Sequence, residues 1–214
     1  MNDRFAIRIG YSQSTQSPEW YRPDQVCAWR NNVHALYFGV DYEQPLRKRL
    51  KLSFCPQLVQ KGYRMDYSFI DPAISSEDSY LYTLTWIDIP INLSFEKNKW
   101  KFRTGIFGSY LLHSDFRFEH KEIFYTNAYI ITFKSANPDI NSYNRFDYGI
   151  NLGVSRKLTD YLDLEFNFTR GLSLPDKFPY GEIRYQESFL FGFKYYFLKP
   201  VKYPVGRKPA LSKG

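Results

Sequence analysis

Ionisable side chains recur at alternate positions of segments whose other residues are mostly large and apolar. A charge enclosed away from water must be paired, because an unpaired buried charge is costly. Such a set therefore forms either a salt-bridge network that fills an interior or the lining of a narrow ion path. The seven candidates are Arg8, Asp88, Arg103, Asp147, Asp163, Glu165 and Lys194.

Residues that would support catalysis or metal binding are scarce. His113-Ser114-Asp115 is the only segment in which a histidine lies beside a nucleophile. Neighbouring residues of an extended strand point to opposite faces, so His113 and Ser114 would point apart. Cys27 and Cys55 show no CxxC or Cys/His spacing, and we expect two free thiols, with a single disulfide as the alternative. We predict that the protein is not an enzyme and carries no metal or cofactor.

Strict alternation of apolar and polar residues would position these groups. Phe146, Tyr148 and Ile150, for example, alternate with Asp147 and Gly149, which is the period of a β-strand with two different faces. The pattern predicts about eight strands, near residues 5–11, 35–42, 50–58, 87–95, 100–106, 146–154, 162–168 and 189–197.

The connections between these segments alternate in length. Short polar turns are predicted at 45–49, 96–99 and 156–160, and long connections at 13–32, 61–80, 113–144 and 171–184. Residues 123–133 are rich in strand-forming types, and we expect them to extend a hairpin rather than to join the main set of strands. Short and long connections in turn are typical of outer-membrane barrels.

One face of nearly every segment is large and apolar, whereas the other combines charges with Gly and Ser. A barrel of about eight strands encloses only enough space for side chains, and a closed sheet satisfies its edge hydrogen bonds in a bilayer. We predict an all-β fold, a transmembrane antiparallel up-and-down β-barrel with short periplasmic turns and long extracellular loops, located in the outer membrane. The small bore favours the salt-bridge network over the ion path. A soluble lipocalin-like barrel that binds a ligand among inward-facing apolar residues is the alternative.

Aromatic residues make up 20% of the chain, a content that suits strands and membrane interfaces. We expect those near strand ends to form girdles at the two interfaces. The girdle candidates are Tyr11, Tyr42, Trp86, Trp100, Tyr110, Tyr161 and Tyr185.

The net charge of +7 does not indicate a nucleic-acid partner, because most of the excess lies in one tail. We assign residues 1–197 to the barrel and 198–214 to a basic periplasmic tail that contacts lipid headgroups or a partner. An outer-membrane protein needs an export signal, and we expect the signal to have been cleaved from this chain. The candidates for partner binding are Trp20, Tyr21 and Trp29 in the first long connection and Lys199, Lys202, Arg207 and Lys208 in the tail.

Several segments resemble the outer-membrane β-barrel family of Bacteroidota that includes PorT-like proteins, a group of small barrels of the OmpA/OmpX kind. They are Pro56-Gln57-Leu58 with the following Gln60-Lys61-Gly62-Tyr63, then Trp86–Leu93 (WIDIPINL), Gly105–Leu112 (GIFGSYLL) and Phe146–Gly153 (FDYGINLG). Members of this family usually finish with a terminal aromatic, whereas here Phe197 ends the last strand and a basic, Pro-containing tail follows it.

The resemblance implies a non-enzymatic scaffold or accessory subunit of an envelope complex, with type IX secretion as a plausible context. Its expected partners are outer-membrane lipid, lipopolysaccharide and other envelope proteins. A lipid A-modifying enzyme of the outer membrane is the alternative, and it would depend on His113.

Overall fold

The computed structural model describes residues 3–17, 27–70, 74–124, 129–136, 144–173 and 185–197. These residues form a single antiparallel sheet of ten strands. Within these ranges there is no helix long and apolar enough to span a membrane. The strands are β1 (Arg4–Ser17), β2 (Cys27–Pro45), β3 (Leu50–Phe54), β4 (Gln57–Ile70), β5 (Ile74–Lys97), β6 (Trp100–Phe124), β7 (Tyr129–Ala136), β8 (Phe146–Lys157), β9 (Leu162–Gly171) and β10 (Tyr185–Tyr196).

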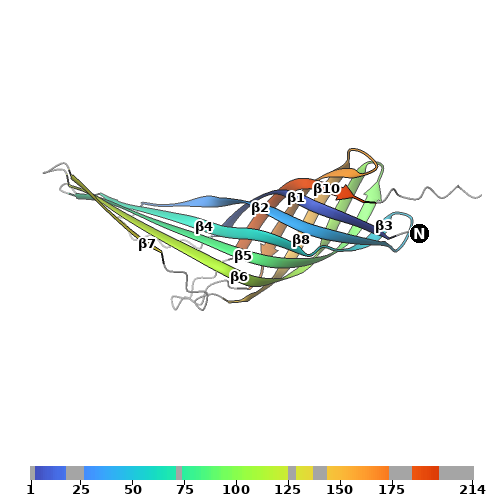
Figure 1. Ribbon diagram of the computed structural model, residues 1–214, viewed down its shortest axis with the longest axis horizontal. Helices are drawn as coiled ribbons and strands as arrows, with labels where there is room; N and C mark the ends of the chain where they lie inside the picture. Colours follow the sequence, from blue (N-terminus) through green and yellow to red (C-terminus); the bar gives the residue numbers. More distant parts are fainter. Residues whose placement is uncertain are drawn as a thin grey trace, which may run out of the picture.

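The sheet closes on itself because β1 pairs with both β2 and β10 (Figure 1). β3 and β4 both lie between β2 and β5, so they are two segments of one strand. Pro56 interrupts this strand, since proline has no N–H to donate, yet Val40 N still donates to Pro56 O at 2.9 Å. The ring therefore has eight strands, and the predicted barrel class is confirmed. The predicted third strand, 50–58, is correct in position but broken at Cys55 and Pro56.

All three short turns lie at one end of the ring, together with the start of β1 and the end of β10 (Figure 1). They connect β2 to β3, β5 to β6 and β8 to β9, as the sequence predicts. In the second of these turns Asn98 adopts a φ of 59°, a left-handed conformation that asparagine tolerates better than most residues.

The opposite end of the ring differs from the prediction, because strands continue where long connections were expected. β4 and β5 are separated by residues 71–73 alone, and their register runs without a break from Gln57↔Asp88 to Ile70↔Ser75. We call the projecting part the arm: residues 61–70, 74–85 and 113–124 of β4, β5 and β6, together with β7 (Figure 1). β7 pairs with the outer part of β6, and β8 pairs with its inner part. The hairpin extension expected around 123–133 is thus confirmed.

Burial alternates along the strands of the ring, and most of the large apolar side chains point outward. Along β8 the exposed apolar residues are Phe146, Tyr148, Ile150 and Leu152. On β6 the outward apolar series runs from Trp100 to Leu112, roughly 40 Å of strand at about 3.3 Å per residue. With the usual tilt of about 40°, this length covers the apolar thickness of a membrane. The apolar face is thus on the outside, the reverse of a soluble ligand-binding barrel.

Trp86 corrects the predicted aromatic girdle. Tyr11, Trp100 and Tyr110 are exposed at the margins of the apolar belt, but Trp86 is only 1% exposed. Because side chains alternate along a strand, Trp86 lies on the same face as the buried Asp88, inside the barrel. The aromatic type of the residue suggested an interface position, whereas its place in the alternation decides that it points inward.

Candidate functional site

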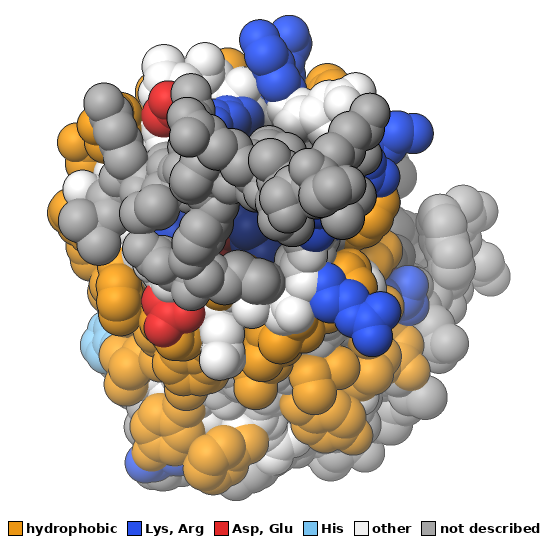
Figure 2. All heavy atoms as spheres, turned by 90° about the vertical axis from the view of Figure 1, so that its right-hand side faces the viewer, with side chains coloured by type: hydrophobic (Ala, Val, Ile, Leu, Met, Phe, Trp, Pro, Cys, Tyr) orange, Lys and Arg blue, Asp and Glu red, His pale blue; other side chains and the backbone are white. Residues whose placement is uncertain are grey.

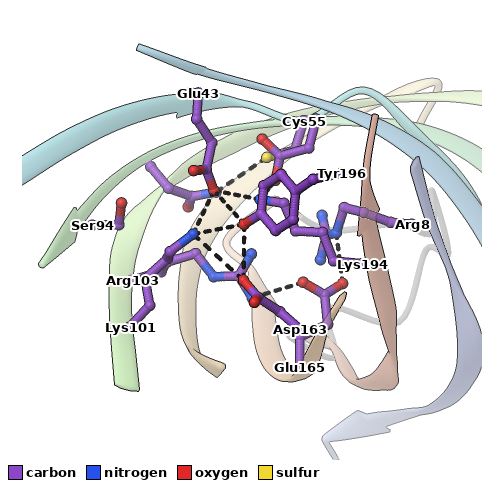
Figure 3. A network of polar contacts seen from close by, with 12 residues as sticks. Arg8, Glu43, Cys55, Ser94, Lys101, Arg103, Asp163, Glu165, Lys194 and Tyr196 are labelled. Carbon is purple, nitrogen blue, oxygen red and sulfur yellow. Dashed lines mark hydrogen bonds and ion pairs between the residues drawn. The ribbon is translucent and has the colours of Figure 1, made fainter. Parts of the chain in front are cut away.

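The barrel interior holds the ionisable residues in layers, and its central layer is organised by one carboxylate. Glu165 of β9 accepts hydrogen bonds from Arg8 Nε at 2.6 Å, Arg103 Nη2 at 2.8 Å and the Tyr37 hydroxyl at 2.9 Å. Arg8 also donates to Gln57 Oε1 at 3.1 Å. All five residues are at most 4% exposed. The carboxylate thus links β1, β2 and β6 to β9 (Figure 3).

A second layer lies toward the short turns and centres on Glu43. Its carboxylate accepts from Lys101 Nζ at 2.7 Å, Lys194 Nζ at 2.5 Å and the Tyr196 hydroxyl at 3.2 Å. Lys194 also pairs with Asp41. The Tyr196 hydroxyl lies 2.8 Å from Asp163 Oδ2 (Figure 3). Asp163 Oδ2 also lies 3.7 Å from Lys101 Nζ, so every charge in this layer is next to an opposite one, as buried charges require.

At the end of the interior nearest the arm, a few polar pairs lie beside a cluster of apolar side chains. Lys61 pairs with Asp88 at 2.7 Å, and the Ser109 hydroxyl donates to the same carboxylate at 2.6 Å. Asp147 has no basic partner among the described ion pairs and instead accepts from the Ser173 hydroxyl at 2.6 Å. A packed apolar cluster lies beside these polar pairs and comprises Tyr37, Val59, Tyr63, Met65, Tyr82, Leu84, Trp86, Leu111 and Leu190.

Tyr37 also shows how close packing fills the bore. It crosses two facing glycines, Gly10 and Gly192, which are paired in the β1–β10 register. A Cβ on Gly10 would lie 2.7 Å from Tyr37 Cε1, and a Cβ on Gly192 would lie 2.5 Å from the Tyr37 hydroxyl. These glycines make the space that the tyrosine needs to reach Glu165.

All seven ionisable residues singled out in the sequence point into the interior. The structure adds further members that the sequence reasoning missed, although alternation places each of them on the polar face of its strand. Asp41, Lys101 and Tyr196 fall within recognised strands, whereas Lys61 was assigned to a long connection and Glu43 follows the predicted end of a strand. The added residues are Tyr37, Asp41, Glu43, Lys61, Lys101 and Tyr196.

The possible catalytic group is not assembled by the fold. His113 is exposed, whereas Ser114 is only 2% exposed and lies on the opposite face of β6. Asp115 accepts a hydrogen bond from Arg117 at 3.2 Å rather than orienting a histidine. In the described part of the chain, no group of three or more His, Cys, Asp or Glu side chains is arranged to hold a metal ion.

The two cysteines occupy distant positions. Cys27 is the first residue of β2 rather than part of a loop, and it is in register with Ser68. Cys55 is buried in the ring as a free thiol. Along the barrel, Cys55 lies about thirteen residues of strand from Ser68, the residue opposite Cys27. This is roughly 40 Å at 3.3 Å per residue, far beyond the reach of a disulfide.

Of the predicted partner-binding residues, Trp29 lies in the described part of the chain. Trp29 lies in β2, in register with Asp66. The others lie outside the described residues, namely Trp20, Tyr21, Lys199, Lys202, Arg207 and Lys208.

The closed ring, the apolar exterior and the polar interior agree with a comparison against protein families. The family described as "Outer membrane protein beta-barrel domain" matches residues 4–174. The chain belongs to this family. The outer membrane is accordingly its location, and the short turns face the periplasm while the arm faces outward. No curated protein matches the sequence.

Solved structures of small outer-membrane proteins are similar to this barrel at low sequence identity. Ail of Yersinia pestis, solved with the heparin analogue sucrose octasulfate, is 12% identical, with a TM-score of 0.46 over 92% of this chain and 100% of that one. Neisserial surface protein A is 9% identical, with a TM-score of 0.37 over 89% and 96%. OprG from Pseudomonas aeruginosa is 9% identical, with a TM-score of 0.35 over 91% and 95%.

Proposed function

We propose that this outer-membrane barrel is a non-enzymatic scaffold or accessory subunit of an envelope complex, and that its arm contacts the partner. The observation that carries the proposal is the contrast between a filled interior and a large projecting sheet. Paired charges and the apolar cluster occupy the bore, so the interior offers no obvious route for a solute. The arm continues for roughly 40 Å of strand past Ile87, at about 3.3 Å per residue.

The inner face of the arm supports this role because it carries a series of packed aromatic rings. Tyr63 stacks on Tyr82 with ring centroids 4.5 Å apart, and Tyr82 contacts Phe116 at 4.8 Å. Farther out, Tyr80 contacts Phe118 at 4.8 Å. Tyr80, Phe116 and Phe118 are half-buried. Rigid aromatic surfaces of this kind are enriched at protein interfaces.

The edge of the arm offers a second mode of contact. β7 is the last strand of the sheet, and β6 is its only partner among the described strands. An open strand edge can pair with an extended segment of another protein. The arm can therefore contribute both aromatic side chains and backbone hydrogen bonds.

The PorT-like resemblance supports an envelope machine such as type IX secretion as the context. It rests on the sequence motifs around Pro56, Pro90, Gly105 and Gly149. In this proposal lipopolysaccharide surrounds the outward part of the belt, and the loop aromatics and the basic tail add contacts to envelope proteins.

The test compares two double substitutions on opposite faces of the same strands. Tyr80→Ser with Phe118→Ser changes the inner face, and Leu81→Ser with Arg117→Ser changes the outer face at the next register position. Each variant is cross-linked in native membranes, purified in mild detergent and quantified by mass spectrometry. We expect the inner-face variant to lose the cross-links formed by the arm and the outer-face variant to keep them. Equal cross-linking of both variants and the native protein would refute a contact through the inner face.

A further inference from the structure

The short turns at the periplasmic end carry a concentration of basic side chains. Seven of them follow one another around the rim, and all but Lys157 are exposed. We call these residues the basic collar: Arg47, Lys48, Arg49, Lys97, Lys99, Arg156 and Lys157.

Backbone hydrogen bonds join the three turns of the collar into one rim. Glu96 N donates to Arg49 O at 2.8 Å, which links the first turn to the second. Lys157 N donates to Lys99 O at 2.7 Å, which links the second to the third. The basic side chains are therefore held at a common level by the ends of paired strands.

The collar is largely unneutralised by acidic neighbours. Lys157 pairs with Asp160 at 2.6 Å, but none of the other six collar residues makes an ion pair within the described ranges. Glu96, the acid closest to the second turn in sequence, pairs with Lys51 at 2.6 Å and Lys101 at 3.3 Å, so its charge is engaged elsewhere.

The arm shows the opposite arrangement. The surface basic residues of the arm whose side chains are described are paired: Arg64 with Asp66 at 2.9 Å, Arg117 with Asp115 at 3.2 Å, and Lys121 with Glu77 at 3.6 Å. Among the described side chains, exposed basic residues without an ion pair are therefore concentrated at the periplasmic end.

The collar borders the apolar belt directly. Arg156 is in register with Trp100, and its guanidinium carbon lies 5.6 Å from the indole centroid. Leu46 and Leu158 are 50% and 47% exposed within the same turns. Figure 2 looks onto this end and shows Lys and Arg side chains next to the hydrophobic flank. Aromatic and basic residues in this arrangement mark the level of lipid headgroups.

We propose that the basic collar binds the phosphate groups of anionic phospholipids in the periplasmic leaflet. Unpaired cations beside the belt attract anionic headgroups, with an affinity gain of roughly fivefold for each basic residue near the surface. Trp100, Leu46 and Leu158 hold the collar at headgroup depth. The resulting lipid ring fixes the height of the barrel and keeps its short turns at the inner surface of the membrane.

The experiment measures lipid selectivity of the full chain in phosphatidylcholine bilayers. Trace spin-labelled phosphatidylglycerol or phosphatidylcholine is added, and electron paramagnetic resonance gives the fraction of each lipid that the protein immobilises. The collar variant carries Lys97→Gln, Lys99→Gln and Arg156→Gln. The matched control carries Arg64→Gln, Arg117→Gln and Lys121→Gln on the arm, with the same change in net charge. A third chain lacks residues 199–214.

We expect the native protein to prefer phosphatidylglycerol, the collar variant to lose this preference several-fold, and the control to keep it. The preference of the native protein should also weaken at high ionic strength. Heat-dependent migration on gels establishes that each variant is folded. The proposal is overturned if the native protein has no preference, if both triple variants lose it equally, or if only removal of the tail abolishes it. A collar variant that keeps the native lipid preference would also overturn it.

Discussion

Replacing Glu165 with glutamine tests the idea that one carboxylate neutralises the centre of the barrel. Glutamine has nearly the same size and can still bond with the Tyr37 hydroxyl, so the main change is the loss of one negative charge. Arg8 and Arg103 lie 2.6 Å and 2.8 Å from the carboxylate. Without it, two buried guanidinium groups face one another across the bore with one fewer counter-charge.

The expected cost follows from breaking a buried ion pair. Removing one partner and leaving the other charged destabilises proteins by about 3–5 kcal/mol, and here a single change affects two partners. The free energy of unfolding is measured by reversible urea titration in lipid vesicles, followed by tryptophan fluorescence. Glu187→Gln is the matched control, because Glu187 is partly exposed and pairs with Arg170 at 3.4 Å. That control should cost less than about 1 kcal/mol.

A double-substitution cycle separates charge balance from packing. Arg103→Gln added to Glu165→Gln returns the Arg8, Arg103 and Glu165 group to its native net charge, because one guanidinium is removed together with the carboxylate. We expect the double variant to be more stable than the sum of the two single effects predicts, by about 0.5–3 kcal/mol. Additive effects, or a Glu165→Gln variant within 1 kcal/mol of the native protein by the same titration, would refute the role assigned to this carboxylate.

Three further predictions concern the interior, the arm and the tail. Trp86→Ala should lower the free energy of unfolding by about 3–5 kcal/mol, as expected for a large buried side chain. The loss should exceed that of Trp100→Ala on the lipid face, and equal urea midpoints of the two variants would contradict the inward position of Trp86. Hydrogen bonds to Asp78 at 2.5 Å and to Glu122 at 3.1 Å raise the pKa of His120 above its usual value. The stability that protonated His120 contributes to the arm is therefore complete below that usual value, and it is lost as the pH rises through the raised pKa. An NMR titration should show the raised pKa, and Asp78→Asn should lower it. Deleting Lys199–Gly214 should leave the barrel folded on unheated gels but reduce the recovery of envelope partners, and unchanged recovery would exclude the tail as a contact.

The distribution of the ionisable residues between the two faces could be predicted from the sequence, because period-two alternation forces it. Arg8, Asp147 and Lys194 each lie among outward-facing Phe, Tyr and Ile residues, and a strand cannot turn one side chain without turning its neighbours. The same rule shows why Trp86 was misplaced: its chemical type was given more weight than its position two residues before Asp88.

The lengths of the strands beyond the membrane could not be read in the same way. Residues 61–80 contain Tyr63, Met65 and Tyr67 at alternate positions, but they also contain charged residues at 64, 66, 77 and 78, so they resemble a polar connection. Only pairing between β4, β5 and β6 shows that these residues form a continuous sheet, in which Asp66 accepts a hydrogen bond from Arg64. Hydrogen bonds to a neighbouring strand, rather than hydrophobic patterning, determine this part of the structure.

The class of the protein follows from local properties of the chain, namely alternation, a large apolar face on each strand and short turns. The partners of each charge depend instead on how distant strands pair. Glu165 meets Arg8 across 157 positions and Arg103 across 62 positions of the chain, and Lys157 meets Lys99 at the rim through backbone hydrogen bonding alone. Ring closure brings such residues together, since it fixes which strands are neighbours and at what register they pair.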